Sequence, residues 1–453
     1  MNETTAQRPA ENKMGVMPIN RLLITMSLPM IVSMLVQALY NIVDSMFVAQ
    51  LSENALTAVS LAFPVQSLMI AVGSGTGVGI NALLSKSLGE KNFDLADKTA
   101  ENGIFLAVLS YLLFAVIGVL FSKPFFLLQT TDPEIVENGA IYLMLCCVCS
   151  FGMFLQFTFE RLLQSTGRTF YTMITQGLGA IINIILDPIM IFGLLGFPKL
   201  GVAGAALATV IGQIVASILA LLFNIKKNEE ITLRLKGFRP NAKVIGKIYS
   251  VGIPSIIMAS IGSVMTFGMN KILISFTSTA TAVFGVYFKL QSFVYMPVFG
   301  LNNGMVPIVA FNYGARQKQR IMKTMKLAIA YAFGMMLIGL AIFQIFPAEL
   351  FRMFNASEAM LSIGIPSLRI ISISFLFASI NIISISMLQA LGHGIYSMLI
   401  SVGRQLIVLI PVAFLLSRTG NLNLVWLAFP LAETVAVVLS IIFLKKNLKA
   451  LDF

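Results

Sequence analysis

The sequence predicts an all-α integral membrane protein, with 12 transmembrane helices in two six-helix bundles that are related by an internal pseudo-two-fold repeat. The first observation is composition: the 453 residues are 57% hydrophobic and 11% charged, and apolar runs recur along the whole chain. That excludes an ordinary soluble protein. The second is the length of these runs, since about 20 apolar residues cross the hydrocarbon core of a bilayer. The third is an internal repeat, in which the segment that begins at Pro29 matches the segment that begins at Pro254.

Polar residues between the apolar runs mark where each span begins. The twelve expected spans begin near Leu22, Leu56, Asn102, Glu134, Thr169, Gly201, Gly246, Thr281, Leu327, Met360, Ile395 and Leu422. This division gives a cytoplasmic lead over residues 1–20, a first lobe over 21–223, a polar cytoplasmic linker over 224–247 and a second lobe over 248–453.

Basic residues gather at alternate junctions between the spans. Of the 31 Lys and Arg residues, 23 lie on the side that holds both termini, 4 lie on the other side, and 4 lie inside spans. Basic loops face the cytoplasm in most membrane proteins. We therefore expect both termini in the cytoplasm, and we attribute the net charge of +12 to topology instead of a nucleic-acid partner.

The repeat aligns the chain with itself without gaps from about residue 29 to residue 185, always at the offset that pairs Pro29 with Pro254. In this register Gly75 matches Gly300, Gly79 matches Gly304, Gly89 matches Gly314, and Gln164 matches Gln389. Because each half contains an even number of spans, the halves have the same orientation and are related by an axis along the membrane normal.

Two carboxylates lie inside the expected spans of the first lobe. Asp187 follows Asn183 by about one helical turn, and Asp44 ends a polar stripe on one face of span one. The stripe consists of Ser33, Gln37, Asn41 and Asp44. A charge at the centre of a membrane costs about 2.5–3.5 kcal/mol on insertion scales, so these carboxylates indicate a function. The repeat has Met269 and Val412 at the equivalent positions, so the fold itself requires neither carboxylate.

Two alternative roles for these carboxylates stay open. Each could be a structural group that pairs with a buried cation such as Lys271 or Lys289. They could also be the catalytic pair of an intramembrane aspartyl protease. That class carries a Gly-x-Gly-Asp element, whereas Asp187 follows Ile-Leu and precedes a proline.

Two further acidic residues fall within or near spans. Glu433 in the last span could be neutralised by Arg404 or Lys289, which would make it structural, or it could bind substrate. Glu160 is expected to form a local ion pair or gate with Arg161 at the end of span four. No metal-ligand or nucleophile cluster appears in the sequence, and Cys146, Cys147 and Cys149 are expected to fill helix space. We therefore expect no enzyme activity and no cofactor.

At this point the motifs resemble those of the multidrug and toxic compound extrusion (MATE) transporters, over about residues 20–447. The resemblance is carried by Ser27-Leu-Pro29-Met30 and Gln37-Ala-Leu-Tyr40-Asn41-Ile-Val-Asp44 in span one, Asn183-Ile-Ile-Leu-Asp187-Pro188 in span five, and Gly204-Ala-Ala-Leu-Ala-Thr209 in span six. It implies a V-shaped pair of bundles and a secondary active antiporter that exports amphiphilic or cationic organic compounds in exchange for H⁺ or Na⁺. The NorM-like branch has acidic residues on spans seven and eight, and this chain has none there, so it looks like the DinF-like branch.

The resemblance also implies roles for individual residues. The ion or proton coupling site corresponds to Asp44, Asn183, Asp187 and Thr209, which would bind the metal ion if Na⁺ is the coupling ion. Pro29 marks the bending point of span one. Candidates for the substrate cavity or gate are Pro29, Gln37, Tyr40, Asn41, Lys289 and Glu433.

The expected mechanism follows from charge. Two carboxylates close together in a low dielectric repel each other, so a proton or Na⁺ is needed to neutralise them. Such binding can bias span one between two conformations and so drive alternating access. We expect a monomer in the plasma (inner) membrane, with small amphiphilic drugs and the lipid bilayer as partners. A lipid or lipid-linked oligosaccharide flippase of the same fold stays as the alternative, with Lys271, Lys289 and Arg404 as the cations that it would need.

Overall fold

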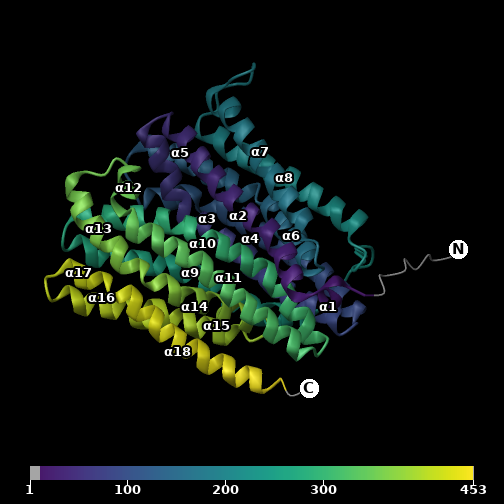
Figure 1. Ribbon diagram of the computed structural model, residues 1–453. Coiled ribbons are helices and arrows are strands. Elements are labelled where there is room, and N and C mark those ends of the chain that lie inside the picture. Colours follow the sequence, from purple (N-terminus) through teal and green to yellow (C-terminus); the bar gives the residue numbers. More distant parts are fainter. Residues whose placement is uncertain (1–10, 452–453) are drawn as a thin grey trace.

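Helices make up nearly all of the structure. The computed structural model describes residues 11–451, and no strand occurs among them (Figure 1). The N-terminal part consists of the short helix α1 (Lys13–Val16) and then α2 (Ile19–Ala49), α3 (Glu53–Gly89), α4 (Phe93–Leu127), α5 (Pro133–Val148), α6 (Phe151–Ser165), α7 (Thr169–Phe192) and α8 (Val202–Lys227).

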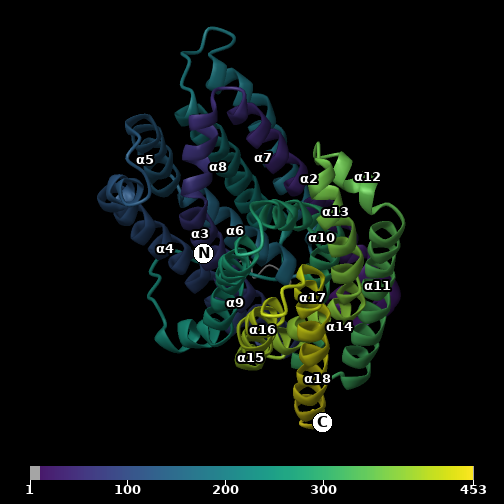
Figure 2. The ribbon, with the colours of Figure 1, turned by 90° about the vertical axis from the view of Figure 1, so that its left-hand side faces the viewer.

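The second lobe begins after an irregular linker and lies beside the first, as Figure 2 shows. Its helices are α9 (Ala242–Ile274), α10 (Ser278–Gly314), α11 (Lys318–Ile345), α12 (Pro347–Arg352), α13 (Glu358–Ser372), α14 (Ser374–Ala390), α15 (Gly394–Val402), α16 (Ile410–Ser417), α17 (Leu422–Trp426) and α18 (Ala428–Lys449). A π-helical segment, η1 (Gly403–Leu409), joins α15 to α16.

The predicted number of spans is confirmed. Among residues 11–451, ten helical segments are each long and apolar enough to cross a membrane, and two bent pairs bring the number to twelve if each pair is one span. The bent pairs are α5 with α6, at 43°, and α13 with α14, at 47°. They occupy equivalent places in the two halves, so the repeat extends to the breaks in its helices.

Helix N-termini also repeat between the halves. Ser52 accepts a hydrogen bond from the backbone N–H of Ala55 at the start of α3, and Thr277 accepts one from Ala280 at the start of α10, each at 3.0 Å. The register of the repeat pairs Ser52 with Thr277. Such side chains satisfy backbone donors that have no partner within the helix. The sequence therefore determines the start of equivalent helices with equivalent caps.

The lobes pack through two equivalent helix pairs, α2 with α10 and α3 with α9, and α3 also packs against α10. A Cβ atom added at Gly75 would lie 2.6 Å from Ile256 Cγ1, and one added at Gly300 would lie 2.5 Å from Ile31 Cα. These two contacts are equivalent in the register of the repeat. The backbones approach this closely because both positions lack a side chain.

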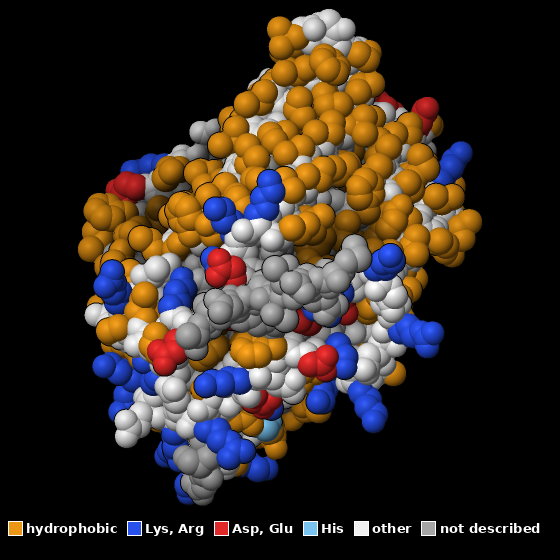
Figure 3. Space-filling view, turned by 90° about the vertical axis from the view of Figure 1, so that its right-hand side faces the viewer, with side chains coloured by type: hydrophobic (Ala, Val, Ile, Leu, Met, Phe, Trp, Pro, Cys, Tyr) orange, Lys and Arg blue, Asp and Glu red, His pale blue; other side chains and the backbone are white. Residues whose placement is uncertain are grey.

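The tightest packing between the lobes lies near the start of α2. All buried residues of α2 except Val48 fall between Ile19 and Ser33, whereas Asp44 lies in the other half of the helix. The lobes therefore meet at the end of the molecule where α2 and α9 begin. Figure 3 views the molecule from the side on which α1 lies, and Lys and Arg side chains are spread around that end.

Helix α1 crosses this end and binds both lobes. Asn12, its N-cap, donates hydrogen bonds to Glu230 Oε1 at 2.8 Å and to the Thr166 carbonyl at 3.3 Å. Arg320 on α11 donates to the Met14 carbonyl at 2.9 Å and to the Met17 carbonyl at 2.8 Å. Met14 is fully buried. The segment is thus a strap between the lobes.

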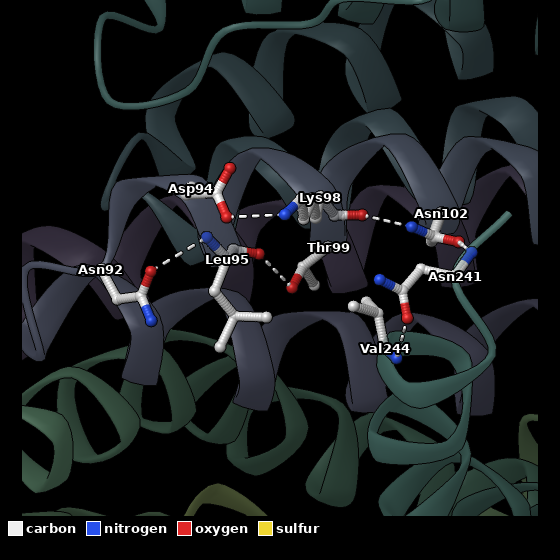
Figure 4. A network of polar contacts seen from close by, with 8 residues as sticks. All are labelled: Asn92, Asp94, Leu95, Lys98, Thr99, Asn102, Asn241 and Val244. Carbon is white, nitrogen blue, oxygen red and sulfur yellow. Dashed lines mark hydrogen bonds and ion pairs between the residues drawn. The ribbon is translucent and has the colours of Figure 1, made fainter. Parts of the chain in front are cut away.

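The linker between α8 and α9 lies along the first half of α4. The Thr232 N–H donates to Asp97 at 2.8 Å, and the Asn241 N–H donates to Asn102 at 2.9 Å. Figure 4 shows the second of these contacts, together with the ion pair between Lys98 and Asp94. The start of α4 therefore continues beyond the apolar span and serves as a platform for the linker.

Candidate functional site

The structure brings Asp44 and Asp187 together. Asp44 lies in the second half of α2 and Asp187 in the second half of α7, and these helices pack against each other. The two carboxyl groups lie within hydrogen-bonding distance of each other. Asp187 is fully buried, and each residue has one buried carboxyl oxygen, Oδ1, without a hydrogen-bond partner. Two predicted site residues that are far apart in the sequence are thus in contact.

Asn183 and Thr209 complete the predicted cluster. Oriented to satisfy both of its amide atoms, Asn183 donates to Asp187 Oδ2 at 3.2 Å and accepts from Thr209 Oγ1 at 3.0 Å and from the Thr209 N–H at 3.2 Å. Asn183 is also buried. All four residues predicted to form the coupling site therefore lie next to one another.

Close packing of α7 against α8 makes this arrangement possible. A Cβ atom added at Gly212 would lie 2.7 Å from the Gly179 carbonyl oxygen, so only glycine fits between the two backbones. The approach places Thr209, one turn before Gly212, beside Asn183, one turn after Gly179. Helix α7 runs without a break through Pro188 to Phe192.

Two cavities flank the cluster. A polar cavity of about 70 Å³ is lined by Asn183, Thr209, Gln37 and Tyr40 on one side and extends to Glu160. A larger cavity of about 290 Å³ is lined by Asp44, Asn41, Gln37 and Tyr40, among others. Three of the four predicted cavity or gate residues of α2, namely Gln37, Tyr40 and Asn41, therefore line space beside the carboxylates, and Pro29 lines neither cavity.

Pro29 lies inside α2, at the end that contacts the second lobe, and is buried. The helix is continuous through it. Ser33 donates a hydrogen bond to the Pro29 carbonyl at 2.9 Å, which satisfies that oxygen within the helix. The proline thus lies in the part of α2 that packs on the second lobe, away from the carboxylate of Asp44.

Glu433 is paired with Arg404, one of the two cations that the sequence offered. Arg404 Nη1 lies 2.6 Å from Glu433 Oε1, and Asn381 donates to Glu433 Oε2 at 2.5 Å. Lys289 instead lies over the ring of Phe354, 5.9 Å from its centroid. Arg404 and Glu433 both line a cavity of about 280 Å³ in the second lobe. Both carboxyl oxygens of Glu433 therefore have partners, and the pair also faces open space.

The expectation of an ion pair between Glu160 and Arg161 is wrong. Arg161 Nη1 donates to Gln164 at 2.7 Å and to Asn303 of the second lobe at 3.1 Å. The Glu160 carboxylate points to neutral partners on α6 and α7 instead. Sequence reasoning therefore missed Glu160 as a candidate site residue. The four-residue spacing from Gln156 was the available signal, because it puts the amide and the carboxylate on one helix face.

No group of three or more His, Cys, Asp or Glu side chains that could hold a metal ion occurs among the described residues. The oxygen donors around Asp44 and Asp187 are two carboxylates, one amide and one hydroxyl, a set that suits a proton or a small hard cation. The three cysteines are free thiols, two of them buried.

Comparison with known proteins supports these observations. A family model described as MatE matches residues 29–189 and again residues 254–415, so its two matches begin at the two prolines that the repeat pairs. The chain is 27% identical to the multidrug export protein MepA of Staphylococcus haemolyticus over 429 residues, which are 94% of each chain. It is 25% identical to MepA of Staphylococcus aureus strain MRSA252 over 440 residues, which are 96% of each chain.

Solved structures share the fold. One is the crystal structure of a protein described as MATE in the straight conformation, with a TM-score of 0.91, 24% identity and coverage of 97% of this chain and 98% of that one. Another is a transporter of the MOP superfamily from Pyrococcus furiosus, with a TM-score of 0.89, 23% identity and full coverage of both chains. The two-lobed helical architecture is therefore the one that these transporters have.

Proposed function

The chain belongs to the MatE family of membrane transporters, and we propose that it exports amphiphilic or cationic organic compounds in exchange for H⁺ or Na⁺ by alternating access. Its MepA relatives are multidrug export proteins, and the similarity extends over nearly the whole of each chain. We further propose a monomer in the plasma (inner) membrane. Both termini lie in the cytoplasm in this proposal, since 23 of the 31 Lys and Arg residues fall on the side that holds the termini.

The contact between Asp44 and Asp187 is the observation that carries this proposal. Two unit charges about 4 Å apart repel by roughly 4 kcal/mol at an effective dielectric constant of about 20. Each carboxylate also keeps a buried oxygen without a partner. Binding of one proton or one Na⁺ would remove the repulsion and satisfy these oxygens. Binding of a cation is therefore favourable at this site, and the doubly charged state is unfavourable.

Asn183 and Thr209 suit both coupling ions. The Asn183 amide stabilises a charged Asp187 through its N–H, and rotation of the amide would turn its oxygen toward a bound Na⁺. The Thr209 hydroxyl, 3.0 Å from the other amide atom of Asn183, is a further oxygen in the cluster. The two ions therefore compete for one set of ligands in this proposal.

Helix α2 connects the ion site to the contact between the lobes. Asp44 lies near one end of the helix, and the segment from Ile19 to Ser33 packs near the other end, with Ile31 against Gly300. A change of charge at Asp44 acts on the position of α2 relative to α7. Because the same helix contacts α10, that change also alters the stability of the closed contact between the lobes.

The placement of the cations favours export of small molecules over a lipid flippase. A flippase for pyrophosphate lipids needs several free cations in one cavity. Arg404 is already paired with Glu433, and both Lys271 and Lys289 are exposed and lie over phenyl rings. These three residues therefore do not combine into one anion site.

Vesicles that contain the purified protein test this function. A pH gradient or a Na⁺ gradient is imposed, and the accumulation of ethidium, a fluorescent organic cation, is followed over time. We expect accumulation that depends on at least one of the two gradients and stops when that gradient is collapsed by an ionophore. Accumulation that neither gradient changes would contradict the antiport proposal.

A further inference from the structure

Glu160 is a buried carboxylate that accepts hydrogen bonds from uncharged side chains. It is 2% exposed. Oε1 accepts hydrogen bonds from Gln156 at 2.9 Å and from Thr175 at 2.8 Å, and Oε2 accepts one from Gln176 at 2.8 Å. The positive charge of its neighbour Arg161 interacts with Glu160 electrostatically, but the guanidinium of Arg161 donates its hydrogen bonds to Gln164 and Asn303. The carboxylate of Glu160 is therefore held by neutral donors, and the guanidinium of Arg161 forms no ion pair with it.

A polar cavity connects Glu160 to the ion site. The cavity of about 70 Å³ is lined at one end by Glu160 and Gln176 and at the other by Asn183 and Thr209. Gln37 adds an amide group to its wall, and Gln176 Oε1 is a buried oxygen without a partner. The space is polar and large enough for water, which can bridge such groups.

Glu160 lies between the ion site and the basic end of the molecule. Its partner Gln176 is separated from Asp187 by about three turns of α7, roughly 16 Å along the helix axis. In the other direction, Gln176 is about two turns from Thr169, where α7 begins at the basic end. A cation that leaves Asp187 through this cavity toward that end therefore meets Glu160.

The second lobe shows that the scaffold does not need this carboxylate. Thr172 donates to the Glu160 carbonyl at 3.4 Å, and Ser397, its equivalent, donates to the carbonyl of Ile385 at 2.9 Å. Ile385 is the residue that the register of the repeat pairs with Glu160. The backbone contact is kept in both lobes, and the carboxylate occurs only in the lobe that holds Asp44 and Asp187.

We propose that Glu160 is a second binding station for the coupling cation, which exchanges with the site at Asp44 and Asp187 through the polar cavity on its way to the basic end. This inference rests on the proposed antiport. The same carboxylate and amide oxygens could bind either a proton or a Na⁺ ion. The experiment therefore has one arm for each ion.

The test compares E160Q with wild type in vesicles under a pH gradient and, separately, a Na⁺ gradient. The substitution should be tolerated, because Gln176 can rotate its amide and let its unpartnered oxygen accept from the new N–H. We expect gradient-driven ethidium accumulation to slow at least tenfold, in the arm in which wild type is active. Binding of ethidium to the protein in detergent should change less than twofold. E137Q, which alters an exposed carboxylate on α5, is the matched control and should behave as wild type.

Two further variants make each outcome decisive. E160D keeps the charge and should shift the pH or Na⁺ concentration for half-maximal transport at least threefold, and it decides the question if E160Q does not assemble. Wild-type behaviour of these Glu160 variants while D187N is inactive would overturn the role of Glu160 alone. Wild-type behaviour of D187N as well would overturn the proposed antiport.

Discussion

Arg404 and Glu433 illustrate how the second lobe handles charge within the membrane. The pair is joined at 2.6 Å, Asn381 holds the second carboxyl oxygen, and Arg404 Nε has no partner. In the described part of the first lobe, Asp44 and Asp187 have no such cation beside them. The two lobes therefore differ in their buried charges: the second lobe holds an ion pair, whereas the first lobe holds two adjacent carboxyl groups, which a proton or Na⁺ neutralises in our proposal.

We expect the Glu433 pair to contribute mainly to stability. E433Q or R404Q alone leaves an uncompensated buried group, which costs about 3–5 kcal/mol, whereas the double variant should recover part of this loss. Thermal unfolding in detergent measures the effect, with K289Q as a control that should leave stability unchanged. Stable single variants that no longer bind ethidium would instead assign Glu433 to substrate.

The sequence alone could not predict whether Arg404 or Lys289 pairs with Glu433. The sequence identified the acidic residue and two possible cations, but only the path of the chain through η1 decides which of them reaches Glu433. Glu160 was missed for a related reason. Its partners Thr175 and Gln176 come from another helix, and the adjacent Arg161 suggested a local pair that the structure does not form.

Helices α2, α3, α9 and α10 form the contact between the lobes, and glycines set how closely they approach. Gly75 and Gly300 each lie against an isoleucine of the opposite lobe. A methyl group at either position would meet backbone atoms of that isoleucine or its Cγ1 atom. The isoleucine cannot move away from such a methyl group unless its helix shifts.

We therefore expect G300A to weaken the closed contact by about 1–3 kcal/mol. Spin labels at Lys98 and Lys323, which are exposed at the basic end of the two lobes, should report longer distances than in the parent protein. G334A on α11 is the control, because a Cβ atom there meets nothing within 4 Å. Unchanged distances in G300A would show that this glycine does not limit closure.

Helix α1 should stabilise the same contact from outside. R320Q removes the hydrogen bonds to Met14 and Met17, and hydrogen bonds from charged groups contribute about 1.5–3 kcal/mol each. Hydrogen exchange of the α1 amides should become faster in R320Q and stay unchanged in R316Q, which alters an exposed arginine nearby. Equal exchange in both variants would exclude α1 as a strap.

The ends of the elements were harder to predict than their number. Helix α4 begins at Phe93, well before the expected Asn102, because Asn92 caps it and its first turns lie against the linker outside the apolar span. The bends in α5–α6 and α13–α14 left no clear signal in the sequence. Composition reports which segments enter the membrane, whereas caps and bends depend on local polar contacts and on packing.

For the whole molecule, the twofold repeat was visible in the sequence because glycines and prolines keep their register where lobes or helices meet. The orientation in the membrane is a prediction of charge alone. Reporter tags at Lys199 and Lys236 should lie on opposite sides, with Lys236 in the cytoplasm, because 23 of the 31 basic residues are on its side. Tags that report the same side would contradict the predicted topology.

The shared ion site is the central claim, and transport by D44N, D187N and the double variant tests it most directly. An Asp→Asn change keeps the size and a hydrogen-bonding oxygen but removes the charge that binds a proton or Na⁺. Ethidium accumulation in vesicles is measured under imposed pH and Na⁺ gradients. We predict that each single variant loses gradient-driven transport at least about tenfold and that the double variant is no worse, because residues that act as one site are not additive. Full transport by either single variant, or two partial losses that multiply in the double variant, would contradict a shared site.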